Sequence, residues 1–224
     1  ITSTITISVV DASSDNDFDP VADKTVSATT TDNDIAGFTV VQSGGSTGVA
    51  ETGTTDTFTV VLTAQPASNV VLSISSEDVG EASVAPSSLT FTPANWNSAQ
   101  TVTVTGVDEN VVDGDQNSNI TVAVLDVASD NSFDDLADQT VSATTTDNDV
   151  AGFTVAQTDG STSVAETGTT DTFTIVLNAQ PTSNVVLTIT SSDTGEATVN
   201  TPLTFTNTNW DTPQTVTVTG VDDD

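Results

Sequence analysis

Carboxylates are the residues of this chain that could do chemistry. Of its 224 residues, 32 are Asp or Glu, Lys24 is the only base, and His, Cys, Arg and Tyr are absent. Nucleophile–base pairs of the usual kinds therefore cannot be built. Oxygen ligands without nitrogen or sulfur donors favour Ca²⁺ over transition metals, and about six to eight such oxygens from several loops suit that ion.

The net charge narrows the choice of partners. The formal value is −31, so the chain repels nucleic acid phosphates and anionic membranes, and neither is an expected partner. No apolar run approaches the roughly 18 residues that a membrane helix needs, so no membrane insertion is expected. An acidic composition is also typical of disorder, but 35% of the residues are hydrophobic and they alternate with polar ones in strand-like runs. A folded chain of this charge needs cations, and clustered carboxylates suggest bound ones.

An internal repeat organises the chain. The stretch TTTDNDIAGFTV at 29–40 returns as TTTDNDVAGFTV at 144–155, an offset of 144 − 29 = 115 residues. Residues 5–34 align with 120–149 at this offset, and 21 of those 30 positions are identical. After Val199 the offset becomes 114, as between Trp96 and Trp210. The chain is therefore a tandem array with a unit near 115 residues, a usual size for one domain.

The repeat predicts one complete domain and two partial ones. Residues 35–149 are the complete repeat, 1–34 match the C-terminal part of a preceding repeat, and 150–224 match the N-terminal part of a following one. Asp224 corresponds to Asn110 and Ile1 to Gln116. We expect either an excerpt of a longer covalent array or end fragments that complete one another between copies by strand complementation.

A two-residue period predicts antiparallel strands throughout. Thr and Ser alternate with Val, Ile, Leu or Phe, and no stretch has a helical period. Seven short strands in roughly a hundred residues predict an all-β fold, an immunoglobulin-like β-sandwich. The expected strands are 37–42, 57–64, 70–75, 83–92 (interrupted by Pro86), 101–107, 119–127 and 139–146. The expected core is Phe38, Val40, Phe58, Val60, Leu62, Val70, Leu72, Ile74, Leu89, Phe91, Val102, Val104, Ile120, Val122, Val124 and Val141, with Trp96 at a turn closing one end.

Strand direction gathers the carboxylates at one pole. If successive strands alternate in direction, the loops after the first, third and fifth strands and the end of the seventh share that pole. The acidic residues there are Glu51, Glu77, Asp78, Glu81, Asp108, Glu109, Asp113, Asp115, Asp147 and Asp149. Such crowding is destabilising without a cation, so we predict Ca²⁺ there, with a solvated acidic rim as the alternative. The candidate metal ligands are Asp32, Asp34, Glu51, Asp78, Asp108, Glu109, Asp113, Asp147 and Asp149, and, in the following repeat, Glu166, Asp193, Asp222 and Asp223.

The joints between repeats are short and acidic. Asp147-Asn148-Asp149 separates the last strand of one repeat from the first strand of the next, as Asp32-Asn33-Asp34 does one repeat earlier. The opposite pole carries the loop 126–135, matched by 11–19, and should face the acidic pole of the preceding unit. Calcium at the joint could then bridge neighbouring repeats and stiffen the array.

At these residues the unit resembles a Calx-beta domain, the calcium-binding sandwich of sodium–calcium exchangers and integrin β4 that recurs in giant secreted bacterial proteins. The similar segments are VAETG at 49–53, VTGVDEN at 104–110 and DND at 147–149. The resemblance implies calcium ligation by Glu51, Asp108, Glu109, Asp147 and Asp149. Asn33, Asn110 and Asn148 interrupt the runs of aspartates seen in exchangers, which lowers the charge. The near-identical tandem copies resemble the extender regions of bacterial surface adhesins.

The sequence gives little support for an enzymatic function. Asp193-Thr194-Gly195 matches the aspartic-protease triplet, but a paired lobe is missing, and the EF-hand-like spacing at Asp113 lacks the required Gly and the final Glu. A carboxylate pair could in principle hydrolyse glycosides, yet the acids recur in the turns of each repeat, which structure explains better.

We therefore expect a non-enzymatic, secreted protein at the cell surface: a calcium-stiffened β-sandwich array that forms an extracellular filament, fibre or adhesin stalk. Its expected partners are neighbouring repeats or identical subunits in a filament. The alternatives are a calcium-dependent module that binds a carbohydrate or adhesion ligand, and a calcium sensor.

Overall fold

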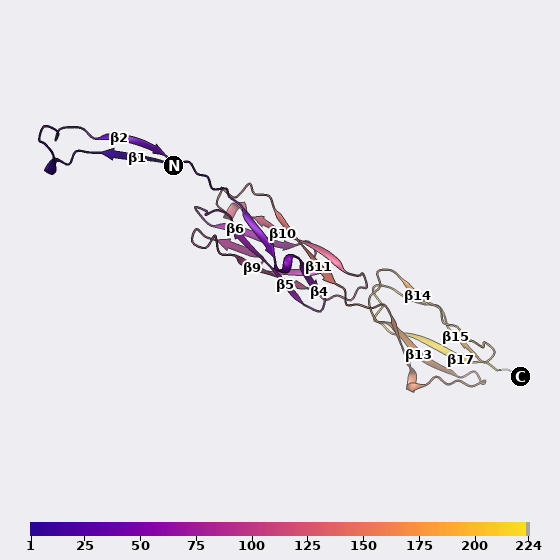
Figure 1. Ribbon diagram of the computed structural model, residues 1–224. Helices are drawn as coiled ribbons and strands as arrows, with labels where there is room; N and C mark the ends of the chain where they lie inside the picture. The colour runs from indigo at the N-terminus through magenta and orange to yellow at the C-terminus, as the bar shows by residue number, and fades with distance from the viewer. Residues whose placement is uncertain (223–224) are drawn as a thin grey trace.

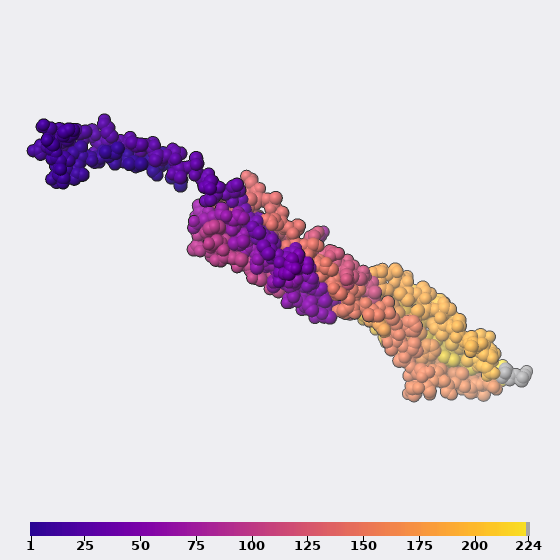
Figure 2. Space-filling view, viewed as in Figure 1, coloured from indigo at the N-terminus to yellow at the C-terminus, as the bar shows by residue number. Residues whose placement is uncertain are grey.

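The computed structural model describes residues 1–222 as three successive parts along one line (Figure 1). A thin N-terminal hairpin is followed by a complete sandwich, and an open sandwich lies at the other end (Figure 2). The regular elements of the described residues are strands and short 3₁₀ turns, so the protein is all-β as predicted. No helix in residues 1–222 has the length and apolar character needed to cross a membrane.

The middle unit is a sandwich of two sheets with an immunoglobulin-like arrangement. One sheet has the strand order β3-β5-β9-β7 and the other has the order β4-β11-β10-β6-β8. All neighbouring strands are antiparallel except β4 and β11, which run parallel. The strands are β3 (Phe38–Gln42), β4 (Thr47–Ala50), β5 (Thr55–Leu62), β6 (Val70–Ser76), β7 (Ala82–Ala85), β8 (Ser88–Phe91), β9 (Gln100–Gly106), β10 (Gln116–Val124) and β11 (Gln139–Thr146).

One predicted strand is divided between the sheets, and one strand of the structure was not predicted. The single strand expected over 83–92 is wrong, because β7 pairs with β9 while β8 pairs with β6 in the opposite sheet. Pro86 lies between the two pieces and has no N–H to continue a ladder. At the start of the unit, the chain crosses from β3 to β4 through the turn Ser43–Gly45, where Gly44 and Gly45 have positive φ angles. The strand β4 was not predicted from the sequence.

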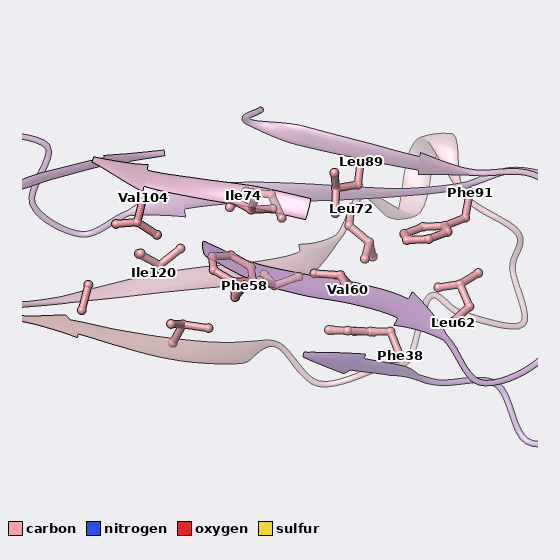
Figure 3. Close-up of a cluster of buried hydrophobic side chains, with 14 of the residues drawn as sticks. Phe38, Phe58, Val60, Leu62, Leu72, Ile74, Leu89, Phe91, Val104 and Ile120 are labelled. Carbon is pink, nitrogen blue, oxygen red and sulfur yellow. The ribbon is translucent and has the colours of Figure 1, made fainter. Parts of the chain in front are cut away.

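The core lies between these sheets and follows the predicted alternation (Figure 3). Fourteen of the sixteen predicted core residues are buried, and Val40 and Val124 pack against them half-buried, as does Trp96. The core also contains Phe133, which comes from the loop between β10 and β11 and is only 2% exposed. Phe133 thereby closes the end of the sandwich at the loop between β10 and β11.

The N-terminal hairpin repeats the last two strands of the middle unit. Strand β1 (Thr2–Ile7) pairs with β2 (Lys24–Thr29), with Thr2 opposite Thr29. The equivalent pair in β10 and β11 is Asn117 opposite Thr144, so both hairpins have the same register. The 3₁₀ turn Asp11–Ser13 likewise matches Asp126–Ala128. The hairpin is therefore formed in its final register, although its apolar side chains are exposed.

The C-terminal unit forms the same first sheet but only a fragment of the second. Its sheets have the orders β12-β13-β17-β15 and β14-β16. Five residues form its buried core, with Phe173, Val185, Leu187, Ile189, Val199 and Trp210 partly buried around them. The strands are β12 (Phe153–Gln157), β13 (Thr170–Leu177), β14 (Val185–Leu187), β15 (Ala197–Val199), β16 (Leu203–Phe205) and β17 (Gln214–Gly220).

Candidate metal centre

A cluster of carboxylates occupies the pole of the middle unit from which β11 leads into the next unit. Two groups share Glu51, and within each group one side-chain oxygen per residue lies within 4.8 Å of the others. The first group contains Glu81, Glu109 and Asp113, and the second contains Asp147 and Asp149. The strand directions thus bring together residues from four separate segments, as the alternation of strands predicts.

Glu51 lies at the centre because β4 delivers it beside the end of β11. Its backbone N–H donates to the carbonyl of Thr146 at 3.2 Å, and its side chain is 1% exposed. Gly106, at the end of β9, packs against Ala50, the residue before Glu51. A Cβ at Gly106 would lie 2.1 Å from the Ala50 carbonyl oxygen. Only glycine permits this approach, which brings the ends of β4 and β9 together.

The segment after β11 folds over the cluster through its own hydrogen bonds. The Asn148 N–H donates to Glu51 Oε2 at 3.0 Å, and the Asp149 N–H donates to Asp147 Oδ1 at 2.6 Å. Asp147 Oδ2 accepts from the Gly114 N–H at 2.8 Å, and Gly114 adopts a φ of +76°. These contacts draw the loop 107–115 towards the joint, so one ion could be reached by ligands from both segments.

Several carboxylate oxygens in the cluster have no hydrogen-bond partner. Glu81 Oε2, Glu109 Oε1 and Asp149 Oδ2 are buried and unpaired. An unpaired buried charge is strongly destabilising, and Lys24, the only basic side chain, lies in β2 of the hairpin. The residues present therefore fit a hard cation with several oxygen ligands, and Ca²⁺ is the ion that such a set favours.

The electrostatics of the cluster oppose ionisation of its carboxyl groups. Burial, together with the nearby charges of Asp113, Glu109, Glu51 and Asp78, raises the pKa of Glu81 to about 7. Burial is also the main reason that the pKa values of Glu51, Glu109 and Asp149 are raised. Shifts of this direction follow from desolvation and like charge, and a bound cation would reverse them.

The structure places the predicted ligands of the middle unit in different roles. Glu51, Glu109, Asp113, Asp147 and Asp149 are in the cluster. Asp108 is beside it and accepts from Asn148 Nδ2 at 3.0 Å.

Asp78, a predicted ligand, lies outside the carboxylate cluster, whereas Glu81, which was not among the predicted ligands, lies within it. Asp78 caps its own turn by accepting from the Gly80 N–H at 2.9 Å. Glu81, from the same loop, takes part in the cluster instead. The available signal for Glu81 was its recurrence as Glu196 in the next repeat.

The remaining predicted ligands are separated in this chain. Asp32 and Asp34 are exposed in the linker after β2. Glu166 and Glu196, the counterparts of Glu51 and Glu81, border an open pocket in the C-terminal unit. Asp193 caps Gly195 as Asp78 caps Gly80, Asp222 is exposed, and Asp223 lies outside the described residues.

The loop that supplies Glu109 and Asp113 also contacts the next unit. The Gln180 N–H donates to the Asn110 carbonyl at 2.6 Å, and the Val112 N–H donates to the Gln180 carbonyl at 3.2 Å. Val111 and Gln180 thereby form a parallel bridge. The candidate site and the contact between units therefore share one short loop.

Comparison with known proteins gives similarity to solved structures at low sequence identity. No protein-family model matches the chain, and no curated protein matches it. Solved structures similar to it include CBD12 from CALX1.2, at 14% identity and a TM-score of 0.33, covering 82% of this chain and 76% of that one. The apo-form Calx CBD1 domain has 12% identity and a TM-score of 0.33 over 50% of this chain and 98% of that one.

A surface-layer protein also shows similarity. Domains 1–6 of SbsC have 16% identity and a TM-score of 0.37, covering 90% of this chain and 24% of that one. Identities and TM-scores this low carry no information on function, so function has to be inferred from the chain's own residues. The link to bacterial adhesins stays a prediction.

Proposed function

We propose that this chain is a structural, extracellular β-sandwich array in which Ca²⁺ at the acidic pole of each complete unit fixes the orientation of the next unit. The observation that carries the proposal is the cluster around Glu51. Glu51 and Glu81 are buried there without a basic partner, beside half-buried Glu109, Asp147 and Asp149, and three carboxylate oxygens of the cluster are unpaired. A solvated acidic rim would instead leave Glu51 and Glu81 exposed.

The site can act on the joint because of its position in the loop 107–115. Glu109 and Asp113 flank the three residues that hydrogen-bond or bridge to Gln180. An ion held by these side chains, by Glu51 and Glu81, and by Asp147 and Asp149 would neutralise their repulsion. It would also order the loop and the three-residue joint together, and two ordered connections between units resist bending better than one.

The rival function, a carbohydrate-binding module, has less support from the tryptophans. Trp96 and Trp210 are the only indole rings in the chain, and both pack partly buried against their cores. Their position favours a structural role over an open platform for sugar stacking. Calcium-dependent binding in a glycan array, abolished by Trp96→Ala, would support the rival.

The decisive experiment is unfolding of the whole chain in EGTA and in about 1–10 mM CaCl₂, a range set by extracellular sites that bind at roughly 0.1–1 mM. The Trp210→Phe background leaves Trp96 as the fluorescence reporter of the middle unit. We expect its melting temperature to rise with calcium, because a ligand that binds only the folded state stabilises it. Small-angle scattering should show a longer, stiffer particle in calcium.

Matched variants connect the effect to the cluster. The pair Glu51→Gln and Glu81→Gln should remove the calcium-dependent rise, whereas Asp78→Asn, outside the cluster, should keep it. Mg²⁺ should substitute poorly because it requires a stricter octahedral shell. Equal melting temperatures with and without calcium would identify the cluster as an acidic end without a bound ion.

A further inference from the structure

The acids at the pole of the middle unit divide into two sets. Six form the carboxylate cluster, in which Glu81 Oε2, Glu109 Oε1 and Asp149 Oδ2 are buried without a partner. The other four acids lie outside the cluster, and each accepts a hydrogen bond from the protein. They are Glu77, Asp78, Asp108 and Asp115, and their donors are Asn119 Nδ2, the Gly80 N–H, Asn148 Nδ2 and the Asp147 N–H. Donors of the protein thus satisfy the acids that the cluster does not include.

Asn148 is the donor that contacts both sets of acids. Its backbone N–H donates to Glu51 Oε2, inside the cluster, at 3.0 Å. Its side-chain Nδ2 donates to Asp108 Oδ1, outside the cluster, also at 3.0 Å. An ionised carboxylate only accepts hydrogen bonds, so the amide must present its nitrogen to Asp108. An aspartate in place of Asn148 would instead set two ionised carboxylates against each other, an arrangement that requires a cation.

Asp108 is close enough to the cluster to become a ligand of a bound ion. It precedes Glu109, which belongs to the cluster. Burial, followed by the nearby charges of Asp147 and Asp108, raises the pKa of Asp149, so the Asp108 carboxylate acts on the cluster electrostatically. The side chain of Asp108 is exposed, and its hydrogen bond to Asn148 directs one of its oxygens to the amide. The amide, rather than distance, therefore keeps Asp108 out of the cluster.

We propose that Asn148 limits the number of cations that the cluster binds, because its amide holds Asp108 outside as a hydrogen-bond acceptor. This inference rests on the proposed calcium function and adds the residue that sets the number of ions. A neutral amide at this position also reduces the repulsion between carboxylates before calcium binds. Asn33 occupies the same place between Asp32 and Asp34, so the same limit is expected at the joint before the middle unit.

The substitution Asn148→Asp should create a third group of carboxylates. It replaces the donor by a carboxylate beside Asp108 and next to Asp149, and position 148 is exposed, so the change leaves the core intact. Three carboxylates together with water suit Ca²⁺, which takes about six to eight oxygen ligands. The variant should therefore bind one more Ca²⁺ per chain than the unmodified protein. In EGTA its middle unit should melt at a lower temperature, and the rise with calcium should be larger.

Two further variants separate the lost amide from the added charge. Asn110→Asp adds a carboxylate to the same loop and leaves the hydrogen bond between Asn148 and Asp108 in place, so the number of bound ions should not change. The double substitution Asp108→Asn with Asn148→Asp keeps the formal charge and both partners but reverses the bond, because the amide donor is then at position 108. It should bind as many ions as the unmodified protein.

The test counts calcium ions per chain in the full 224-residue protein and in each variant. Native mass spectrometry and calorimetric titration with CaCl₂ give the count, and melting in CaCl₂ confirms that each variant is folded. One additional ion in Asn148→Asp, absent from the double variant, would support the proposal. The same count in the unmodified chain and Asn148→Asp would overturn it. An additional ion in Asn110→Asp or in the double variant would also overturn it, because added charge or position alone would then explain the gain.

The calcium function and the role of Asn148 fail in different ways. If the unmodified chain binds calcium and Asn148→Asp adds no ion, the role of Asn148 is wrong and the calcium function stands. If the unmodified chain binds no calcium, the calcium function is wrong, and the comparison with Asn148→Asp still decides the role of Asn148. A bound ion in that variant would support the limit, and no bound ion would overturn it.

Discussion

The middle and C-terminal units have similar sequences over 35–110 and 150–224, but only the middle unit contains the segment that forms β10 and β11. The sheets β3-β5-β9-β7 and β12-β13-β17-β15 have the same order. The second sheet differs: five strands in the middle unit against two in the C-terminal unit. Phe38 is 6% exposed, whereas its counterpart Phe153 is 54% exposed. The first sheet is therefore specified locally, whereas the second depends on its final hairpin.

The same comparison shows that an acidic residue at an equivalent position does not by itself form the carboxylate cluster. Glu51 is 1% exposed and its counterpart Glu166 is exposed. Glu51 is held by backbone contacts from Thr146 and Asn148, both of which follow or end β11. Without that strand, the acidic sequence is present but the cluster is not assembled. The carboxylate cluster is thus a property of a complete unit.

Removing the aromatic ring that closes the middle unit should have the largest effect. Phe133→Ala deletes a buried side chain and should destabilise the middle unit by about 3–5 kcal/mol, the cost of such a cavity. Urea unfolding followed by Trp96, in the Trp210→Phe background, measures this change. Under conditions that keep the chain monomeric, Phe18→Ala should leave the same transition within about 0.5 kcal/mol. An equal loss of stability in Phe18→Ala would show that the Phe18 ring is already buried.

Removing the carboxylate of Asp130, in the loop between β10 and β11, should cause the next largest loss of stability. Asp130→Ala leaves the N–H groups of Ala67, Ser68 and Ser132 without their acceptor. A hydrogen bond to a charged acceptor contributes about 1.5–3 kcal/mol, and Asp130 is buried, so a loss of at least that size is expected in the Trp96 transition. The matched change Asp15→Ala should be silent in the monomer, and a large effect there would contradict the description of the hairpin as exposed.

Calcium affinity should distinguish the two units. Glu51→Gln is expected to weaken calcium binding to the middle unit by about 10–100-fold, a range typical for the loss of a group that supports a metal site. Glu166→Gln should leave that affinity unchanged, because Glu166 belongs to the open unit. Calorimetric titration of both variants makes the comparison. A comparable loss in Glu166→Gln would place the binding site outside the cluster.

The pH dependence of stability in EGTA tests the same cluster through the protonation of Glu81. The pKa of Glu81 is raised from 4.5 to about 7, so the folded state holds a proton that the unfolded state releases. The resulting stability is fully present below pH 4.5 and is lost as the pH rises through about 7. In EGTA, the urea midpoint reported by Trp96 should fall across this window. Glu81→Gln should flatten the profile, and a rising midpoint would contradict the assigned burial.

Alternation alone was enough to predict the sandwich and its acidic pole. Residues such as Phe58 and Ile120 have the two-residue period that places them inward, and strand parity then gathers Glu51, Glu109 and Asp147 at one end. Both inferences follow from local rules, so they need no knowledge of which sheet a strand joins. Bounds of individual strands were less accurate, since the end of a ladder depends on its partner.

Features that depend on pairing between distant segments could not be read from the pattern. The separate strand β4 exists because β11 pairs with it, and that pairing buries Glu51. Phe133 lies in a polar loop without periodicity, and its recurrence as Phe18 was the available sign. The sequence pattern could not show that Glu81, and not Asp78, joins the carboxylate cluster. That depends on the Glu81 carbonyl accepting from the Val107 N–H, which fixes the backbone of Glu81 beside β9.

The parallel pairing of β4 with β11 has a mechanical consequence. The chain enters the unit through β3 and β4 and leaves it through β11, so tension along the array pulls these neighbours in opposite directions along their length. The ladder from Thr47 opposite Ala143 to Ala50 opposite Thr146 is then loaded in shear, and its bonds must break together rather than one by one. A single molecule pulled from its ends should show one high-force rupture for the complete unit.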